Sequence, residues 1–415
     1  MNTSSLSLDQ GPNISVPFRF FFTAPIFFII FAIALFFTPV NTLELRFDSM
    51  TVAIVHLFTL GVLTLIMIGA LFQMLPVLVG VVAGGNAFVT WLIYSLTVAG
   101  IPIFFLGLYI GIDNLILFGV LLIALGLSIF LISISVDVLK ADRKGKSVPL
   151  MQVSIVSLWL ALILGLILSL SRSGFIDLPW YEALSNFHIV IALFGWAFAL
   201  IVGVSLSVVP MFYVTPEFTP GCRRAIPFII IGALIAFFIL FFLYPSFVFL
   251  AELLMTQGVL MYAYQTIKRL RKRRRPIADV TVEYWKTAMF MILVSVIFWW
   301  LGYIEPIFFT LSFISFGIGF LGSLLQGMMY KIIPFLIWLH LSSSGNFNIP
   351  TIREMINEED MWVQLRLYQI FIALFILAFF FPIIKIIAAS ILIASSIALL
   401  VNFKNAWKTY TTYLG

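Results

Sequence analysis

Residues 185–210 read SNFHIVIALFGWAFALIVGVSLSVVP, an almost uninterrupted apolar run that is long enough to cross a bilayer as one helix. The run carries one ionisable side chain, His188, close to its start. A histidine inside lipid is energetically costly, so such a residue is a functional candidate by default.

The same run contains two glycines and a proline at a spacing that recurs elsewhere in the chain. Gly195 is followed eight residues later by Gly203 and then by Pro210. The spacing returns upstream at Gly61, Gly69 and Pro76, and downstream at Gly319, Gly327 and Pro334. Internal repetition of this kind predicts three equivalent helices in three related units.

Composition places the chain among polytopic membrane proteins. Of its 415 residues 63% are apolar and 10% are charged, and the mean hydropathy is +1.17, values far from those of soluble domains. The net charge of +6 does not indicate nucleic acid, because the basic residues cluster in short loops between apolar runs. The single cysteine, Cys222, excludes an internal disulfide.

Apolar runs of spanning length predict an all-α fold with about twelve transmembrane helices in one domain, 1–415, built as three pseudo-symmetric four-helix units. The units cover roughly 18–138, 151–267 and 285–403, and the loop 341–363 is expected to carry a short interfacial helix that starts near Ile349 and ends at Glu358 to Asp360. The expected spans lie near 18–40, 51–79, 87–110, 114–138, 151–171, 184–213, 225–243, 246–267, 285–304, 308–339, 364–382 and 384–403.

The distribution of lysine and arginine predicts the orientation of these spans. Basic residues follow the fourth, sixth and eighth helices, at 140–146, 223–224 and 268–275, and are sparse in the opposite loops. By the positive-inside rule, both termini should lie in the cytoplasm of a bacterial cell whose inner membrane holds the protein. The run 268–275 could also hold anionic lipid headgroups, although its role in setting the topology is sufficient to explain it.

The chain has three histidines, and two of them occupy similar depths on predicted equivalent helices. His56 and His188 each lie four or five residues inside the second and sixth spans, roughly 6–8 Å from the outer end. Imidazoles at one depth of a bundle can ligate haem iron or copper. The less favoured alternative is a pair of neutral histidines, each hydrogen-bonded to a carbonyl on a neighbouring helix. His340, at the inner end of the tenth span, is too far along its helix to join them.

These residues resemble a known family. Twelve helices, a threefold repeat and outer-side histidines on the second and sixth helices are similar to subunit I of the haem-copper oxidase superfamily. His188, Gly195-Trp196, Gly203 and Val209-Pro210 resemble the tenth-helix pattern of bacterial high-affinity oxidases. The segments 18–22 and 330–335 look like those of short, uncharacterised relatives of the NnrS type, which are linked to nitric oxide metabolism.

The departures from the family pattern limit what the resemblance implies. An oxidase of this family needs copper-ligating histidines on its sixth and seventh helices and a histidine pair on its tenth. In this chain the seventh helix has none, and the corresponding tenth-helix positions are Ser312 and Ile314. The resemblance therefore implies a protein without the oxygen-reducing centre, in which His56 and His188 converge on one b-type haem.

The expected function is accordingly that of an integral membrane haem protein in electron transfer, respiration or the nitric oxide response. Its partners would be the lipid bilayer and an electron donor or respiratory complex. Two other functions stay open at this point. One is a transporter or handling protein for copper, haem or a small solute, with copper on His56 and His188 and soft contacts from Met67, Met74 and Met211. The other is a cofactor-free assembly partner of a respiratory complex.

Overall fold

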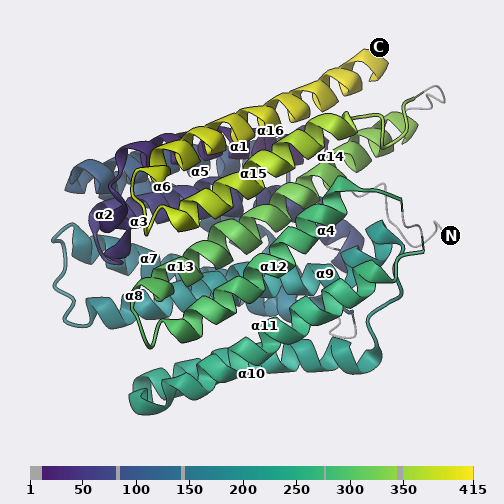
Figure 1. Cartoon of the computed structure of the whole chain (residues 1–415). Helices are drawn as coiled ribbons and strands as arrows, with labels where there is room; N and C mark the ends of the chain where they lie inside the picture. The colour runs from purple at the N-terminus through teal and green to yellow at the C-terminus, as the bar shows by residue number, and fades with distance from the viewer. Residues whose placement is uncertain (1–11, 81–84, 142–144, 275–276, 344–348, 415) are drawn as a thin grey trace. The chain divides into compact units, whose positions relative to one another are not determined.

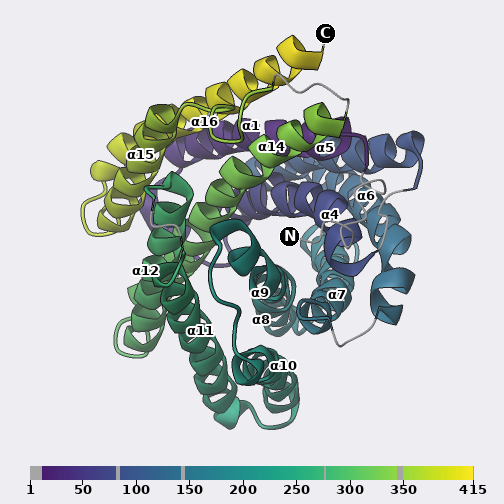
Figure 2. The ribbon, with the colours of Figure 1, turned by 90° about the vertical axis from the view of Figure 1, so that its right-hand side faces the viewer.

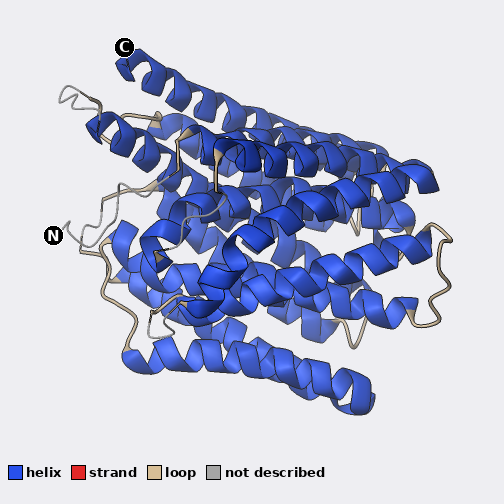
Figure 3. Cartoon of the chain, turned by 180° about the vertical axis from the view of Figure 1, so that it is seen from behind, coloured by secondary structure: helices blue, strands red, loops and turns tan. Residues whose placement is uncertain are grey.

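The computed structural model describes residues 12–80, 85–141, 145–274, 277–343 and 349–414. Within these ranges every regular element is a helix and no strand occurs (Figure 3). Twelve helices are long and apolar enough to cross a membrane. The prediction of an all-α polytopic membrane protein with twelve spans is therefore confirmed.

The described helices pack into two compact units. The first unit comprises Met74–Gly107 and Ile112–Ile277, and the second comprises Pro12–Gln73, Leu108–Gly111 and Ala278–Gly415. The second span and the helix α5 each contribute residues to both units. His188 thus belongs to the first unit, and His56 belongs to the second.

In the first unit, the long sixth span is flanked by its neighbours in sequence. The helices α7 and α9 are in contact, and α10 and α11 lie side by side as a hairpin (Figures 1 and 2). The elements are α5 (Ala87–Ile110), α6 (Asp113–Lys140), α7 (Val148–Arg172), α8 (Tyr181–Val190), a π-helical segment (Ile191–Phe198), α9 (Ala199–Tyr213), α10 (Pro220–Leu243), a short 3-10 turn (Pro245–Phe247) and α11 (Val248–Arg271).

In the second unit, the N-terminal and C-terminal helices pack together. The helix α16 lies against both α1 and α15 (Figure 1). The elements are α1 (Ser15–Phe37), α2 (Val40–Glu44), α3 (Ser49–Phe58), a π-helical segment (Thr59–Thr64), α4 (Leu65–Val79), α12 (Val280–Leu301), α13 (Ile307–Ile314), a π-helical segment (Ser315–Gly322), α14 (Ser323–Ser343), α15 (Glu358–Leu377) and α16 (Ile384–Leu414).

Side-chain caps fix the starts of several helices. Asp48 accepts hydrogen bonds from the backbone of Met50 and Thr51 at the start of α3. Thr219, Asp279 and Asn357 cap α10, α12 and α15 in the same manner. Such caps satisfy N–H groups that the first helical turn leaves without a partner.

The predicted interfacial helix in the loop 341–363 is wrong. The helix α14 continues to Ser343, and residues 352–356 form a turn and a bend and no helix. The acidic residues Glu358 to Asp360, expected to end a short helix, instead make the first turn of the spanning helix α15. This placement is favourable, because acidic side chains stabilise the positive end of a helix dipole.

Three basic residues used for the orientation, Arg143, Lys144 and Arg275, lie outside the described residues. The cytoplasmic placement of both termini stays a prediction. So do the boundaries of the three repeat units.

Candidate functional site

The three long spans that carry the repeated glycines share a local distortion. Each contains one π-helical segment, at Thr59–Thr64, Ile191–Phe198 and Ser315–Gly322. The first glycine of each set, Gly61, Gly195 or Gly319, lies within it. A π-helical turn inserts a residue into the helix and is found frequently at functional sites.

The glycines themselves bring neighbouring helices close together. In each set the first glycine faces a residue of the preceding spanning helix, and the second faces the residue seven positions earlier on that helix. A Cβ added to the glycine would stand far inside van der Waals contact, which explains why small residues occupy these positions. The distances from the added Cβ are 2.7 Å for Gly61 to Phe27, 2.9 Å for Gly69 to Phe20, 2.8 Å for Gly195 to Cβ of Ser157, whose Oγ is nearer still, 2.9 Å for Gly203 to Leu150, 2.8 Å for Gly319 to Met291 and 2.5 Å for Gly327 to Tyr284.

His56 and His188 lie at the same distance in sequence from a π-helical segment. His56 lies three residues before Thr59, and His188 lies three residues before Ile191. His56 lies five residues before Gly61 and His188 lies seven residues before Gly195, so the glycine spacing sets them two positions apart. Relative to the first residue of the π-helical segment, the two histidines occupy the same position. In the tenth span this position is Ser312.

Ser312 is a buried residue that pairs with the preceding helix. Its hydroxyl donates to the carbonyl of Ser295 on α12 at 2.8 Å, and the Ser295 hydroxyl donates to the carbonyl of Ser312 at 3.1 Å. The tenth span therefore uses this level for a contact between α12 and α13.

His56 is half-buried on α3 and is bonded to its own helix. Its Nδ1 lies 2.8 Å from the carbonyl oxygen of Val52, one turn earlier. That distance fits a tautomer in which Nδ1 donates and Nε2 retains its lone pair. A carbonyl at Nδ1 is the usual way in which proteins orient a metal-binding imidazole.

His188 lies on α8 with its ring against α7. A Cβ added to Gly165 would stand 3.3 Å from Cε1 and 3.9 Å from Nδ1 of the imidazole. Phe187, beside it in sequence, packs against Ala161 and Ile191 and against the phenylalanines of α10. The histidine thus stands at the edge of an apolar cluster, where Gly165 leaves room for its ring.

His340 resembles His56 in one respect and differs in position. Its Nδ1 lies 3.0 Å from the carbonyl oxygen of Leu336 on α14. The bond to a carbonyl one turn earlier is therefore common to two histidines, and it does not by itself mark a ligand. Position relative to the π-helical segment is what separates His56 and His188 from His340.

Other candidate ligands have mixed surroundings. The side chains of Met67 and Met74 are buried, whereas Met211 is 39% exposed. Glu252 lies half-buried in the second turn of α11. In the part of the chain that the structure describes, no three side chains of histidine, cysteine, aspartate or glutamate converge as a metal-binding group. The pairing of His56 with His188 stays a prediction.

A buried polar network in the second unit has no counterpart in the sequence prediction. Gln364 on α15 accepts from the Tyr284 hydroxyl and donates to Gln326 at 2.7 Å and to Ser395 at 3.0 Å. These residues come from α12, α14, α15 and α16. Gln326 also donates to the carbonyl of Gly322, the last π-helical residue, at 3.0 Å.

Lys331 on α14 pairs with Asp279, the residue that caps α12. The Lys331 Nζ lies 2.8 Å from Asp279 Oδ2. Burial acts to raise the pKa of Asp279, but the charge of Lys331 and hydrogen bonds from Lys331 and Thr281 outweigh it and leave that pKa below its ordinary value. The pair is therefore charged at neutral pH.

No family model matches this chain, and no curated protein matches it either.

Proposed function

We propose that this integral membrane protein is a haem protein in which His56 and His188 hold one b-type haem. The observation that carries the proposal is their shared position, three residues before a π-helical segment on two helices with the same glycine spacing. Haem, when bound, supplies an iron centre that exchanges electrons or binds a diatomic gas.

The surroundings of both histidines suit this role. The bond from His56 Nδ1 to the carbonyl of Val52 would hold the ring and leave Nε2 as the ligand atom. Gly165 leaves space beside His188, so that the ring can adjust its plane without meeting a side chain of α7 at that point. Both residues would have to be unprotonated at the iron.

The absence of histidines at the other positions that an oxidase requires limits the chemistry. The seventh span, α10, contains no histidine in its sequence, and the third repeat has Ser312 at the equivalent level. We therefore expect the protein to transfer or sense electrons or gas in respiration or the nitric oxide response, and not to reduce oxygen or nitric oxide at an oxidase-like rate. We further propose that the protein lies in a bacterial inner membrane with both termini in the cytoplasm. Its partner would be an electron donor or a respiratory complex.

The test is an absorption spectrum of the purified protein after reduction with dithionite. A six-coordinate, low-spin haem spectrum that carbon monoxide does not change is expected. His56→Ala and His188→Ala should each give a five-coordinate haem that binds carbon monoxide, or no haem, whereas the control His340→Ala should match the wild type. Haem-free protein from haem-replete cells would overturn the proposal.

The second candidate is a transporter or handling protein for copper, haem or a small solute. One observation favours it: the thioether side chains of Met67 and Met74 are buried on the span that carries His56. Copper that co-purifies in place of haem, and that is lost in His56→Ala, would support this alternative. A protein with neither metal nor haem would leave the role of an assembly partner.

A further inference from the structure

Arg269 is a buried cation near the end of α11 in the first unit. Its side chain is 4% exposed. The guanidinium carbon lies 5.3 Å from the centre of the Phe218 ring. Within the described residues, its Nε has no hydrogen-bond acceptor and no carboxylate lies within ion-pair distance of it.

A buried guanidinium without an anion is unusual. Removing its charge from water is strongly unfavourable unless an acceptor or a negative charge replaces the water. The attraction to the face of Phe218 compensates only a fraction of that loss. Among the described residues, no carboxylate at ion-pair distance offsets the charge of Arg269.

A second polar group without a well-directed partner lies one turn away. Thr266 occupies the same face of α11 and is fully buried, and the only partner of its hydroxyl among the described residues is the poorly aligned hydroxyl of Tyr262. A guanidinium and a hydroxyl on one helix face are donors to the same kind of ligand, an oxyanion.

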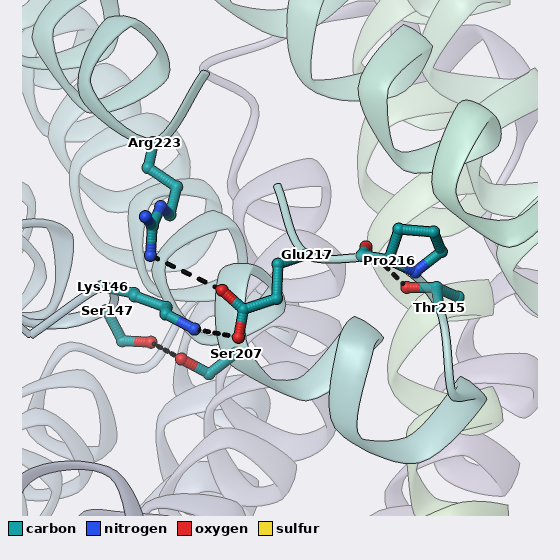
Figure 4. Close-up of polar contacts among 7 residues, drawn as sticks. All are labelled: Lys146, Ser147, Ser207, Thr215, Pro216, Glu217 and Arg223. Carbon is teal, nitrogen blue, oxygen red and sulfur yellow. Dashed lines mark hydrogen bonds and ion pairs between the residues drawn. The ribbon is translucent and has the colours of Figure 1, made fainter. Parts of the chain in front are cut away.

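The nearest carboxylate in sequence to Phe218 is already engaged elsewhere. Glu217 accepts from Lys146 at 2.5 Å and lies 3.7 Å from Arg223, so both of its oxygens face these two cations (Figure 4). The hydrogen bond from Lys146 lowers the pKa of Glu217 more than burial raises it, so the carboxylate stays charged. Glu217 is thus held on the side of Lys146 and is not the counter-charge of Arg269.

The linker that carries Glu217 and Phe218 covers Arg269. It runs from the end of α9 to the start of α10 and opens at Val214, whose φ of 49° is a left-handed conformation that a β-branched residue rarely adopts. The backbone N–H of Arg274, just beyond α11, donates to the carbonyl of Val214 at 3.1 Å. Both ends of the cover are therefore tied to basic segments.

We propose that Arg269 and Thr266 form a binding site for a phosphate group, with Phe218 as its cover. Arginine offers two parallel donors that match the geometry of a phosphate, and Thr266 adds a third. The cations Lys268, Lys272, Arg273 and Arg274 are close to Arg269 in sequence and add positive charge that attracts a phosphate to this end of α11.

The position of Arg269 points to the phosphodiester of an anionic lipid as the source. It lies two residues before the end of α11, about 3 Å along the axis, which is the level at which lipid headgroups meet a span. A soluble phosphate compound would have the same chemistry and must be distinguished by experiment. The proposal is independent of haem.

The test uses the full-length protein in nanodiscs of three kinds: phosphatidylcholine alone, phosphatidylcholine with phosphatidylglycerol, and phosphatidylcholine with inorganic phosphate in the buffer. The unfolding temperature is measured for the wild type, for Arg269→Met and for Arg271→Met. The last variant removes an exposed cation from the same helix and serves as the matched control.

The wild type and Arg271→Met should gain several degrees with phosphatidylglycerol, while Arg269→Met should gain at most a third of that. In phosphatidylcholine alone Arg269→Met should be at least as stable as the wild type, since it removes a buried charge without a partner. A response to inorganic phosphate alone would keep the site but identify a soluble ligand. Equal responses of Arg269→Met and Arg271→Met to every additive would overturn the proposal.

Thr266→Val provides a second variant if Arg269→Met does not fold. It removes one donor and keeps the volume, so the gain with phosphatidylglycerol should fall by about half. Native mass spectrometry should show fewer retained phosphatidylglycerol molecules on Thr266→Val than on Arg271→Met. An unchanged number would contradict the site.

Discussion

The imidazole of His188 lies against Gly165, where an added Cβ would stand 3.3 Å from Cε1 of the ring. At that distance the ring must move by a few tenths of an ångström to admit a methyl group. Gly165→Ala should therefore shift the absorption bands or lower the haem content of the purified protein. The control is Gly232→Ala on α10, where the added Cβ meets Leu254 at an ordinary 3.8 Å. Identical spectra for both variants would show that His188 does not hold the chromophore.

Replacing the second glycine of a set by alanine should destabilise the protein, although alanine in place of glycine usually stabilises a helix. Alanine normally stabilises a helix interior by up to about 1 kcal/mol over glycine, and Gly232→Ala should show that gain. In Gly203→Ala and Gly327→Ala the Cβ would stand 2.9 Å from Leu150 and 2.5 Å from Tyr284, so overpacking should cost about 1–3 kcal/mol. Thermal unfolding in detergent measures the difference, and stabilisation in all three variants would contradict it.

The twelve spans could be predicted because their length is set by the bilayer. The expected span 87–110 coincides with α5 (Ala87–Ile110), and the tenth span differs from its prediction by only a few residues at its C-terminal end. Apolar run length carries this information directly. The prediction of a loop helix near Ile349 was wrong because acidic residues 358–360 suit the first turn of α15 as well as the end of a loop helix. Only the packing of α15 distinguishes the two placements.

The candidate site was less accessible to sequence reasoning. His56 and His188 could be identified because histidines are rare in this sequence. The π-helical segments could not, because a π-helical turn inserts one residue without a characteristic side chain. The two-residue offset of the histidines from their glycines was the one trace of it. The residues that contact the side chains of Gln364 and Arg269 lie far from them in sequence, so no local sequence pattern predicts these contacts.

Because Gln364 bonds to residues of three other helices, replacing its side-chain amide should lower the stability of the protein strongly. Gln364→Leu removes bonds to Tyr284, Gln326 and Ser395 and leaves their polar groups buried. Interhelical hydrogen bonds in membranes contribute about 0.6 kcal/mol on average and up to about 1.7, so a loss of roughly 2–3 kcal/mol is expected. Gln369→Leu, on the exposed face of α15, breaks the bond to Thr287 at 2.7 Å and should change stability by no more than about 0.6 kcal/mol. Unfolding in mixed micelles compares the two, and equal losses would contradict the network's role.

The pair of Lys331 and Asp279 predicts a stability that depends on pH in the acid range. The lowered pKa of Asp279 means that the folded protein favours the carboxylate, so this contribution is present above the ordinary pKa of 3.8 and is lost as the pH falls through the lowered value. Asp279→Asn keeps an oxygen that can cap α12 and removes the charge alone. At pH 7 the variant should lose about 1 kcal/mol, because the pair is only partly buried.

The difference between Asp279→Asn and the wild type should begin to shrink below pH 3.8, where Asp279 of the unfolded chain takes up its proton, and should vanish below the lowered pKa of the folded protein. The control is Glu283→Gln, which breaks the exposed pair with Lys286 at 2.6 Å and should change stability by less than about 0.5 kcal/mol at any pH. Unfolding midpoints between pH 3 and pH 8 test both variants. If Asp279→Asn matches the wild type at pH 7, or keeps its full deficit at pH 3, the charge of Asp279 is not what joins α12 to α14, and the capping hydrogen bond must explain its position.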